Sequence, residues 1–349
     1  MIAPADRAHV LVARLDNAGD VLLAGPAIRA VAAAAGRVTL LCGPGGRAAA
    51  ELLPGVDDVV VFDAPWVSFD APPTSRAAVD ALVDRLAGLG IDQAFVLTSF
   101  HQSPLPLALL LRMAGVAVVA ATSVDYPGSL LDVRHGVLDG AHEVEQSLAL
   151  VGELGYRLPP GDRGALAVRQ RPSPELPLRT PYVVVHPGAS VPARGWDAAR
   201  AAALVPMLVD LGWNVAVTGG PAEVALTAAV AGSAGRDGVV DLGGALDLAG
   251  LADVLEAASV VVCGNTGPAH LAAAVGTPVV SIFAPVVPLG RWGPWQVRTV
   301  VLGDQGIACA GCRARICPFP GQPCLGAVTP EAVVAAIRAL AGAPAGVPA

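Results

Sequence analysis

Short runs of β-branched and other apolar residues alternate with helix-like segments along most of the chain, and this alternation limits the fold more than any other feature. The strand-like runs are residues 9–15, 38–42, 58–62, 93–98 and 116–122 in the first half, and 182–188, 214–220, 238–244, 259–264 and 277–285 in the second. Continuously apolar strands are typical of parallel sheets, which are covered on both faces. The alternation therefore predicts an α/β chain with two doubly wound, Rossmann-like domains.

A proline-rich stretch separates the two halves. Residues 158–181 contain six prolines and little hydrophobic periodicity, which is typical of a linker. We expect an N-terminal domain over residues 1–170, a C-terminal domain over 181–328, and a final helix with a disordered tail over 329–349. A length of 349 residues suits two domains.

The charge and hydropathy patterns exclude several classes of protein. The net charge is −7, so binding to nucleic acid is not expected. The longest uncharged run, residues 257–290, contains Pro278, Pro285 and Pro288, which a membrane-spanning helix would not carry so densely. The first residues lack a basic segment followed by an apolar one. We expect a cytoplasmic protein without a transmembrane segment, and peripheral membrane contact stays open.

The segment VVVCGNTGPAH, residues 260–270, has the composition of an anion site. A strand ends, a turn of small and polar residues follows, and a helix begins at once. The first amides of a helix lack internal partners and carry the positive end of its dipole. Asn265, Thr266, Gly267 and His270 are thus candidate phosphate-binding residues. The alternative is an ordinary turn capped by Asn265 or Thr266.

Two other loops of the second half follow strands in the same way. HPGASVPARGW, residues 186–196, offers Gly188, Ser190 and the guanidinium of Arg194 to a phosphate. VTGGPAE, residues 217–223, offers Gly219 for close approach and Glu223 as an acceptor for ribose hydroxyls. The alternatives are a solvated loop with a surface arginine and a carboxylate that only complements a helix dipole.

A competing motif lies in the first half. GPGGRA, residues 43–48, matches the dinucleotide fingerprint G-x-G-x-x-A, and Asp63 could bind a ribose. This would make the chain an NAD(P)-dependent oxidoreductase. Against it, Pro44 stiffens the turn, and the motif follows the second strand of the domain rather than the first.

Four cysteines are concentrated near the C-terminus, in CAGCRARICPFPGQPC. They are Cys309, Cys312, Cys317 and Cys324. This density is typical of a metal site, and in a reducing compartment zinc is favoured over disulfides. The spacing is not that of two paired CxxC knuckles, so packing by reduced thiols is the alternative.

The ordered set of loops resembles glycosyltransferase family 9, the ADP-heptose:lipopolysaccharide heptosyltransferases and their relatives. The matching motifs are VLVARLDNAGDVLLAGPAIRAV, PGVDDVVVFD, VVVHPGASVPARGW, VAVTGGPAE, the segment from VVDLGG to GTPVV, APVVPLGRWGPW and the cysteine segment. They run over nearly the whole chain, in order. The resemblance implies the GT-B architecture, in which two Rossmann-like domains face a cleft.

The resemblance also implies a reaction and its residues. The family transfers a sugar from a nucleoside-diphosphate sugar with inversion and without a metal. Its catalytic base falls on Asp20, although the local sequence alone favours a helix cap at this position. Its cationic phosphate ligand falls on Arg194, its helix-start phosphate site on Thr266 and Gly267, and its ribose glutamate on Glu223. The family commonly has aspartate at the position of Asn265, so this departure leaves the donor sugar open.

The acceptor is expected on the N-terminal domain. The candidate acceptor-side residues are Asn17, Ser99, His101, Gln102 and Arg134. The acceptor itself could be a cell-envelope glycan, a glycolipid or a small metabolite. A sugar-nucleotide-binding module without catalytic activity is a further alternative.

Overall fold

The computed structural model describes residues 7–68, 73–99, 101–169, 178–232 and 237–343. The chain divides into two compact units, Met1–Arg169 and Gln170–Ala349, each with its own sheet and core. Residues 170–177 of the predicted linker and residues 344–349 of the predicted disordered tail lie outside the described residues.

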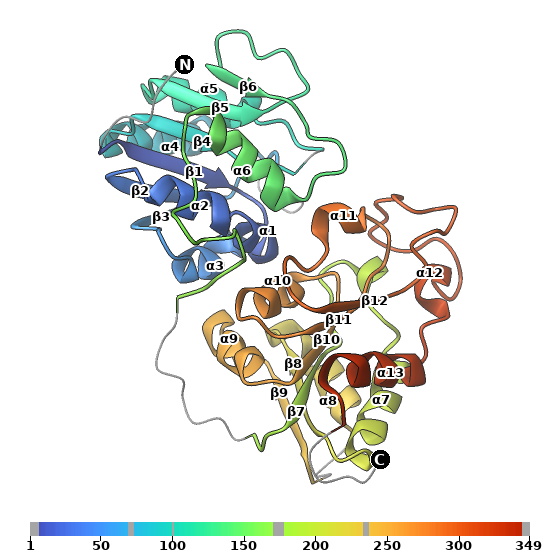
Figure 1. Ribbon diagram of the computed structural model, residues 1–349. Helices are drawn as coiled ribbons and strands as arrows, with labels where there is room; N and C mark the ends of the chain where they lie inside the picture. Colours follow the sequence, from blue (N-terminus) through green and yellow to red (C-terminus); the bar gives the residue numbers. More distant parts are fainter. Residues whose placement is uncertain (1–6, 69–72, 100, 170–177, 233–236, 344–349) are drawn as a thin grey trace. The chain divides into compact units, whose positions relative to one another are not determined.

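The N-terminal unit is a parallel sheet of the order β3-β2-β1-β4-β5-β6 (Figure 1). Its strands are β1 (His9–Arg14), β2 (Arg37–Cys42), β3 (Asp58–Val61), β4 (Gln93–Val96), β5 (Val118–Thr122) and β6 (Val133–His135). Its helices are α1 (Ala18–Leu23), α2 (Gly25–Ala32), α3 (Arg47–Leu52), α4 (Arg76–Leu89), α5 (Leu105–Met113) and α6 (Glu143–Glu153), with the 3₁₀ turn η1 (Pro44–Gly46) before α3. Helices α2 and α6 pack together, as do α4 and α5.

The C-terminal unit repeats this topology, with the order β12-β11-β10-β7-β8-β9. Its strands are β7 (Tyr182–His186), β8 (Asn214–Gly219), β9 (Val239–Gly243), β10 (Val260–Gly264), β11 (Val279–Ile282) and β12 (Thr299–Leu302). Its helices are α7 (Ala198–Asp210), α8 (Val224–Ala231), α9 (Leu248–Glu256), α10 (Gly267–Ala274), α11 (Leu289–Trp292), α12 (Pro323–Gly326) and α13 (Pro330–Ala341), with the 3₁₀ turns η2 (Pro192–Arg194) and η3 (Pro221–Glu223). Figure 1 shows α9 and α10 on one face of this sheet and α7, α8 and α13 on the other.

The apolar runs form these sheets because each central strand is covered by helices on both faces. Strand β1 is buried from Val10 to Arg14, and β7 is buried throughout. All pairings are parallel. The predicted α/β class with two doubly wound domains is confirmed. In such sheets ligands bind beyond the carboxyl ends of the strands, where the strand order reverses.

Each unit has a sixth strand that the sequence pattern missed. Strands β6 and β12 lie at sheet edges, and none of their residues is buried. Strand β6 (VRH) contains no apolar run, and the run in β12 (TVVL) is short and only partly buried.

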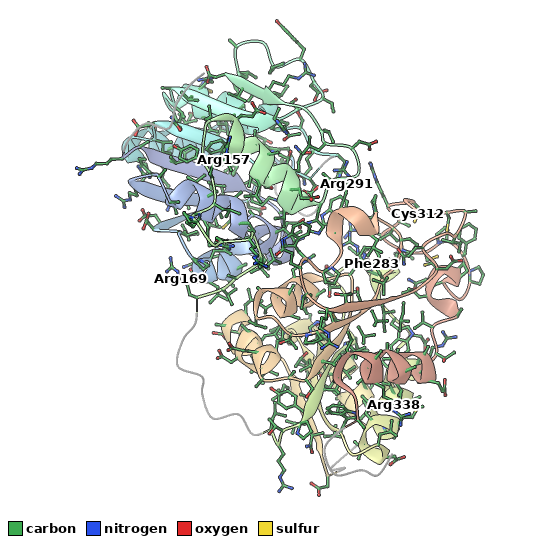
Figure 2. The ribbon with its side chains drawn as sticks, viewed as in Figure 1. Arg157, Arg169, Phe283, Arg291, Cys312 and Arg338 are labelled. Atoms are coloured by element: carbon green, nitrogen blue, oxygen red, sulfur yellow. The ribbon has the colours of Figure 1, made fainter. Side chains whose placement is uncertain are left out.

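Two segments complete the units. Helix α13 packs against α7 and so belongs to the C-terminal unit. At the end of the N-terminal unit, Arg169 donates to the carbonyls of Leu53 and Val56, close to α3 (Figure 2). Within the described residues, none of the helices is long and apolar enough to cross a membrane.

Candidate active site

The predicted site residues gather at the same place in both units. In the N-terminal unit they follow the adjacent strands β1 and β4, and in the C-terminal unit they follow β7, β8 and β10. These are the points at which the strand order reverses, between β1 and β4 and between β7 and β10.

The N-terminal site is built around Arg14, which the sequence reading overlooked. Its side chain is only 2% exposed. Its guanidinium contacts three carboxylates: Nε lies 2.8 Å from Asp16 Oδ2, Nη2 lies 3.0 Å from Asp20 Oδ1, and Nη1 lies 3.1 Å from Glu143 Oε2. We call Arg14, Asp16, Asp20 and Glu143 the acid cluster.

Two predicted acceptor-side residues join the acid cluster. Ser99 is buried, and its hydroxyl accepts a hydrogen bond of 2.9 Å from Arg14 Nη2. The amide of Gln102 donates to Asp16 Oδ1 at 2.6 Å, while Gln102 Oε1 accepts from the backbone of Ser99. The loops after β1 and β4 are thereby joined side chain to side chain.

The charges of the cluster perturb one another. Burial lowers the pKa of Arg14, but the attractions of Asp16, Asp20 and Glu143 outweigh it and raise that pKa. Burial raises the pKa of Asp16 to about 6 against the pull of Arg14, and the neighbouring Asp20 and Glu143 add to the rise. The guanidinium therefore stays charged, whereas Asp16 titrates close to neutral pH.

Asp20 does not cap a helix. It lies within the first turn of α1, whose N-terminal residue Asn17 makes no side-chain capping bond. The Asp20 carboxylate is held instead by Arg14, and its side chain is 24% exposed.

The remaining acceptor-side residues lie apart from this cluster or on its surface. Asn17 and His101 are exposed. Arg134 lies on the edge strand β6, where its guanidinium donates to the carbonyls of Ser123 and Val124. Arg134 thus has a local partner in the turn after β5.

The glycines of GPGGRA are explained by packing. A Cβ at Gly45 would lie 2.7 Å from Asn17 Oδ1, and one at Gly46 would lie 2.7 Å from Val21 Cγ2. A Cβ at Gly43 would overlap the Leu15 carbonyl. The turn η1 needs glycine so that the loop and helix after β1 can approach it, which removes the main argument for a dinucleotide site.

In the C-terminal unit, Glu223 lies among glycines. Its Oε2 accepts from the Gly220 amide at 2.8 Å, and its carboxylate occupies the space where a Cβ of Gly188 would be. A Cβ at Gly219 would also come within 3.1 Å of Glu223 Cβ. The predicted residues Gly188, Gly219 and Glu223 are therefore in mutual contact.

His186, the last residue of β7, lies beneath Glu223. Its Nδ1 is 3.0 Å from Thr218 Oγ1, and its Nε2 is 3.8 Å from Glu223 Oε2. Burial lowers the pKa of His186, and the nearby Glu223 carboxylate opposes this. The imidazole is neutral at physiological pH and shares the end of β7 and β8 with Glu223.

The loop of Arg194 meets the turn that opens α10. A Cβ at Gly264 would lie 2.9 Å from the Arg194 carbonyl, so glycine permits this approach. Arg194 ends the turn η2 and is partly buried, whereas Ser190 is exposed.

The start of α10 agrees only in part with the sequence prediction. Thr266 occupies the N-cap position without a side-chain capping bond, so the turn is not capped by its own threonine. The Thr266 amide, however, donates to the Gly264 carbonyl at 2.9 Å and is already used. Asn265 and His270 are buried, and Asn265 Nδ2 donates to the Ala284 carbonyl.

The four clustered cysteines line one cavity of about 160 Å³ together with Ala193, Phe319 and Gln322. All four are free thiols, from the exposed Cys312 (Figure 2) to the buried Cys324. Among the described residues, no group of three or more His, Cys, Asp or Glu side chains is placed to hold a metal ion. The predicted zinc site therefore has no support from the geometry.

The cysteine segment is bonded to the loop that carries Arg194. The Ala193 amide donates to the Arg315 carbonyl at 2.9 Å, and Gln322 Nε2 donates to the Ala193 carbonyl at 2.7 Å. These two hydrogen bonds fix the backbone of Ala193, the residue before Arg194.

The family can be stated from a match to the glycosyltransferase family 9 (heptosyltransferase) model over residues 97–322, more than half of the chain. The chain belongs to glycosyltransferase family 9. A curated relative, lipopolysaccharide heptosyltransferase 3 of Escherichia coli, is 29% identical over 117 residues, which cover 33% of this chain and 34% of the relative. The chain thus matches about a third of that relative's length.

Solved structures share the fold over almost the full length of the chain. A family 9 glycosyl transferase from Veillonella parvula has a TM-score of 0.77 at 18% identity, covering 97% of this chain and 98% of its own. The Escherichia coli heptosyltransferase WaaC with ADP has a TM-score of 0.68 at 20% identity, covering 96% of this chain and 99% of its own. The family model thus gives the family of this chain, and the solved structures share its fold.

Proposed function

We propose that this family 9 glycosyltransferase moves a sugar, heptose or a related one, from a nucleoside-diphosphate sugar to a hydroxyl group with inversion and without a metal. ADP is the favoured nucleotide, because the related WaaC structure contains ADP. The acceptor is a cell-envelope glycan, a glycolipid or a small metabolite. The observation that carries the proposal is the partly exposed Asp20 carboxylate, fixed by Arg14 where the strand order reverses.

In the proposed reaction Asp20 acts as the general base. It takes the proton of the acceptor hydroxyl as that oxygen bonds to the anomeric carbon. The bond from the anomeric carbon to the diphosphate breaks, and its electron pair leaves with the phosphate. General bases of this kind contribute roughly 10²–10⁴-fold to the rate.

The C-terminal unit would bind the donor. Arg194 and the first amides of α10 would hold the diphosphate, because a guanidinium and a helix start both favour negative charge. Glu223 would accept hydrogen bonds from the ribose hydroxyls, since its carboxylate lies at the adjacent strand end. Asn265 carries no charge, so its side chain would contact the donor as a neutral amide.

The test is Asp20→Asn, with ADP binding measured by calorimetry and ADP release from ADP-heptose measured over a panel of glycan and glycolipid acceptors. We expect turnover to fall by roughly 10²–10⁴-fold with the ADP affinity unchanged. The control is Asp63→Asn, which makes the same chemical change in the exposed loop after β3. Turnover retained by Asp20→Asn, or absent from the wild type with every acceptor and sugar nucleotide, would contradict the proposal.

A further inference from the structure

Arg14 joins three separate parts of the N-terminal unit through one buried guanidinium. Its partners come from the loop and helix after β1, from the end of β4 and from the start of α6. Arginine presents its donors in a rigid planar fork, so fixing two of its nitrogens also fixes the direction of the third. Glu143 accepts a hydrogen bond from Nη1, and Asp16 lies 2.8 Å from Nε as an ion pair without hydrogen-bond geometry, which leaves Nη2 for Asp20 and Ser99.

Glu143 is the most deeply buried of the three carboxylates. Its side chain is 3% exposed, against 11% for Asp16 and 24% for Asp20. Its position is set by the helix start, where His142 and Glu145 form a reciprocal capping box. Glu143 is therefore the carboxylate furthest from solvent, and Asp20 is the most accessible of the three.

A buried ion pair is a poor way to stabilise a fold. Taking charges out of water costs several kcal/mol per ion, and well-packed apolar residues often serve equally well. The neighbouring core of β1 consists of apolar side chains such as Leu11 and Ala13. The Arg14–Glu143 pair is therefore better explained by the direction it gives to the guanidinium than by stability.

We propose that Arg14 is a positioning residue for the Asp20 carboxylate and that Glu143, remote from the reacting atoms, fixes Arg14 in turn. This inference rests on the proposed function of Asp20 as the base. Arg14 orients Asp20 by donating a hydrogen bond to Oδ1 and places a positive charge beside its carboxylate. The positive charge of Arg14 attracts the Asp20 carboxylate. Glu143 is negative and pairs with the same guanidinium, so it weakens that attraction. Arg14 and Glu143 therefore have opposite electrostatic effects on Asp20.

Because Arg14 and Glu143 carry opposite charges, their removal should shift the pH dependence of kcat in opposite directions. A purely structural role for the two residues would not produce opposite shifts. The charged groups that face Asp20 are Arg14 on β1, Asp16 in the next loop and Glu143 on α6. In Arg14→Met the base loses the cation that lies 3.0 Å from Oδ1 and stabilises negative charge there, so the acid limb of the kcat profile moves to higher pH. In Glu143→Gln the lost anion lets Arg14 act more strongly on Asp20, so that limb moves to lower pH.

The experiment measures kcat, KM and pH profiles by ADP release from ADP-heptose. We expect kcat to fall about 100-fold in Arg14→Met and about 10-fold in Glu143→Gln, with the donor KM unchanged. Arg14→Lys keeps the charge and should recover part of the loss. The control is Glu145→Gln, because glutamine preserves the capping box two residues along the same helix.

The outcomes separate this inference from the proposed function. Opposite shifts of the acid limb, together with wild-type ADP affinity and the partial recovery in Arg14→Lys, support it. Shifts in the same direction, or a Glu143→Gln variant that behaves like Glu145→Gln while Asp20→Asn is inactive, overturn this inference alone. Full turnover in Asp20→Asn overturns the proposed function instead. If Arg14→Met does not fold, Arg14→Lys and Glu143→Gln decide.

Discussion

The two units share one topology but carry opposite chemistry at the equivalent point of their sheets. In the N-terminal unit three carboxylates surround one arginine, a formal charge of −3 + 1 = −2 when all are ionised. In the C-terminal unit glycines surround one carboxylate, and the backbone of the Arg194 loop adjoins the turn before α10. The shared topology places both sets of residues at equivalent strand ends, and the side chains there differ in charge.

The two sites also differ in how they are built. Side-chain ion pairs hold the acid cluster in place, whereas the absence of Cβ atoms shapes the C-terminal site. The first design buries charge and should respond to pH. The second brings backbone close to a ligand and should respond to added side-chain volume.

The largest expected effect concerns the pH dependence of the acid cluster. Burial raises the pKa of Asp16 from 3.8 to about 6, so the folded state binds this proton more tightly than the unfolded state. The contribution of Asp16 is complete below pH 3.8 and is lost as the pH rises towards 6. Over that window the free energy of unfolding should fall by about 3 kcal/mol relative to Asp16→Asn.

Chemical unfolding of both proteins between pH 4 and pH 7 measures this difference. A difference between wild type and Asp16→Asn that is constant with pH would contradict it. The acid cluster would then no longer differ from the C-terminal site by a pH-dependent contribution to stability.

The next effect concerns the anion site. Arg194→Ala should weaken ADP binding by roughly 10–100-fold, because charge-assisted hydrogen bonds contribute about 1.5–3 kcal/mol. Calorimetry measures the affinity. Arg338→Ala, on α13 (Figure 2), removes the same charge from the same unit and should leave the affinity unchanged. Equal weakening in both variants would mean that only net charge matters.

The smallest effect tests the close packing around Glu223. In Gly188→Ala the methyl group would overlap the Glu223 carboxylate and release it from the Gly220 amide. Loss of such a hydrogen bond costs about 1 kcal/mol, so ADP affinity should fall about fivefold. Inorganic pyrophosphate, which has no ribose, should bind as before. In the control Gly195→Ala the nearest atom is 3.4 Å from the new methyl, an acceptable contact. Equal losses with ADP and pyrophosphate would contradict a ribose role for Glu223.

Much of the fold could be read from the sequence because continuous apolar runs mark strands covered on both faces. The central strands β1, β4, β7 and β10 carry such runs, whereas the edge strand β6 carries none and the short run of β12 is only partly buried. The turn GPGGRA shows the converse difficulty. Its glycines match a cofactor motif, and only the position of Asn17 and Val21 reveals that they serve packing.

The candidate site was predictable to the extent that it lies in loops directly after strands. Asp20 lies in the first turn of α1 after β1, and Glu223 lies in the turn η3 after β8; they remain the proposed base and the proposed ribose ligand. Arg14 and Glu143 were not predictable, because one ends an apolar strand and the other begins a helix 129 residues later. The one signal in the sequence was a charged residue, Arg14, at the end of an otherwise apolar strand.

The sequence by itself determined the strand–helix alternation, the two doubly wound domains and the family, because these depend on local periodicity and on motifs in order. Only the tertiary structure decided which charges meet around Arg14 and which glycines make room for Glu223. The physical reason is that pairing and close approach depend on distances across the sheet, which residues far apart in the chain reach only when the core has formed.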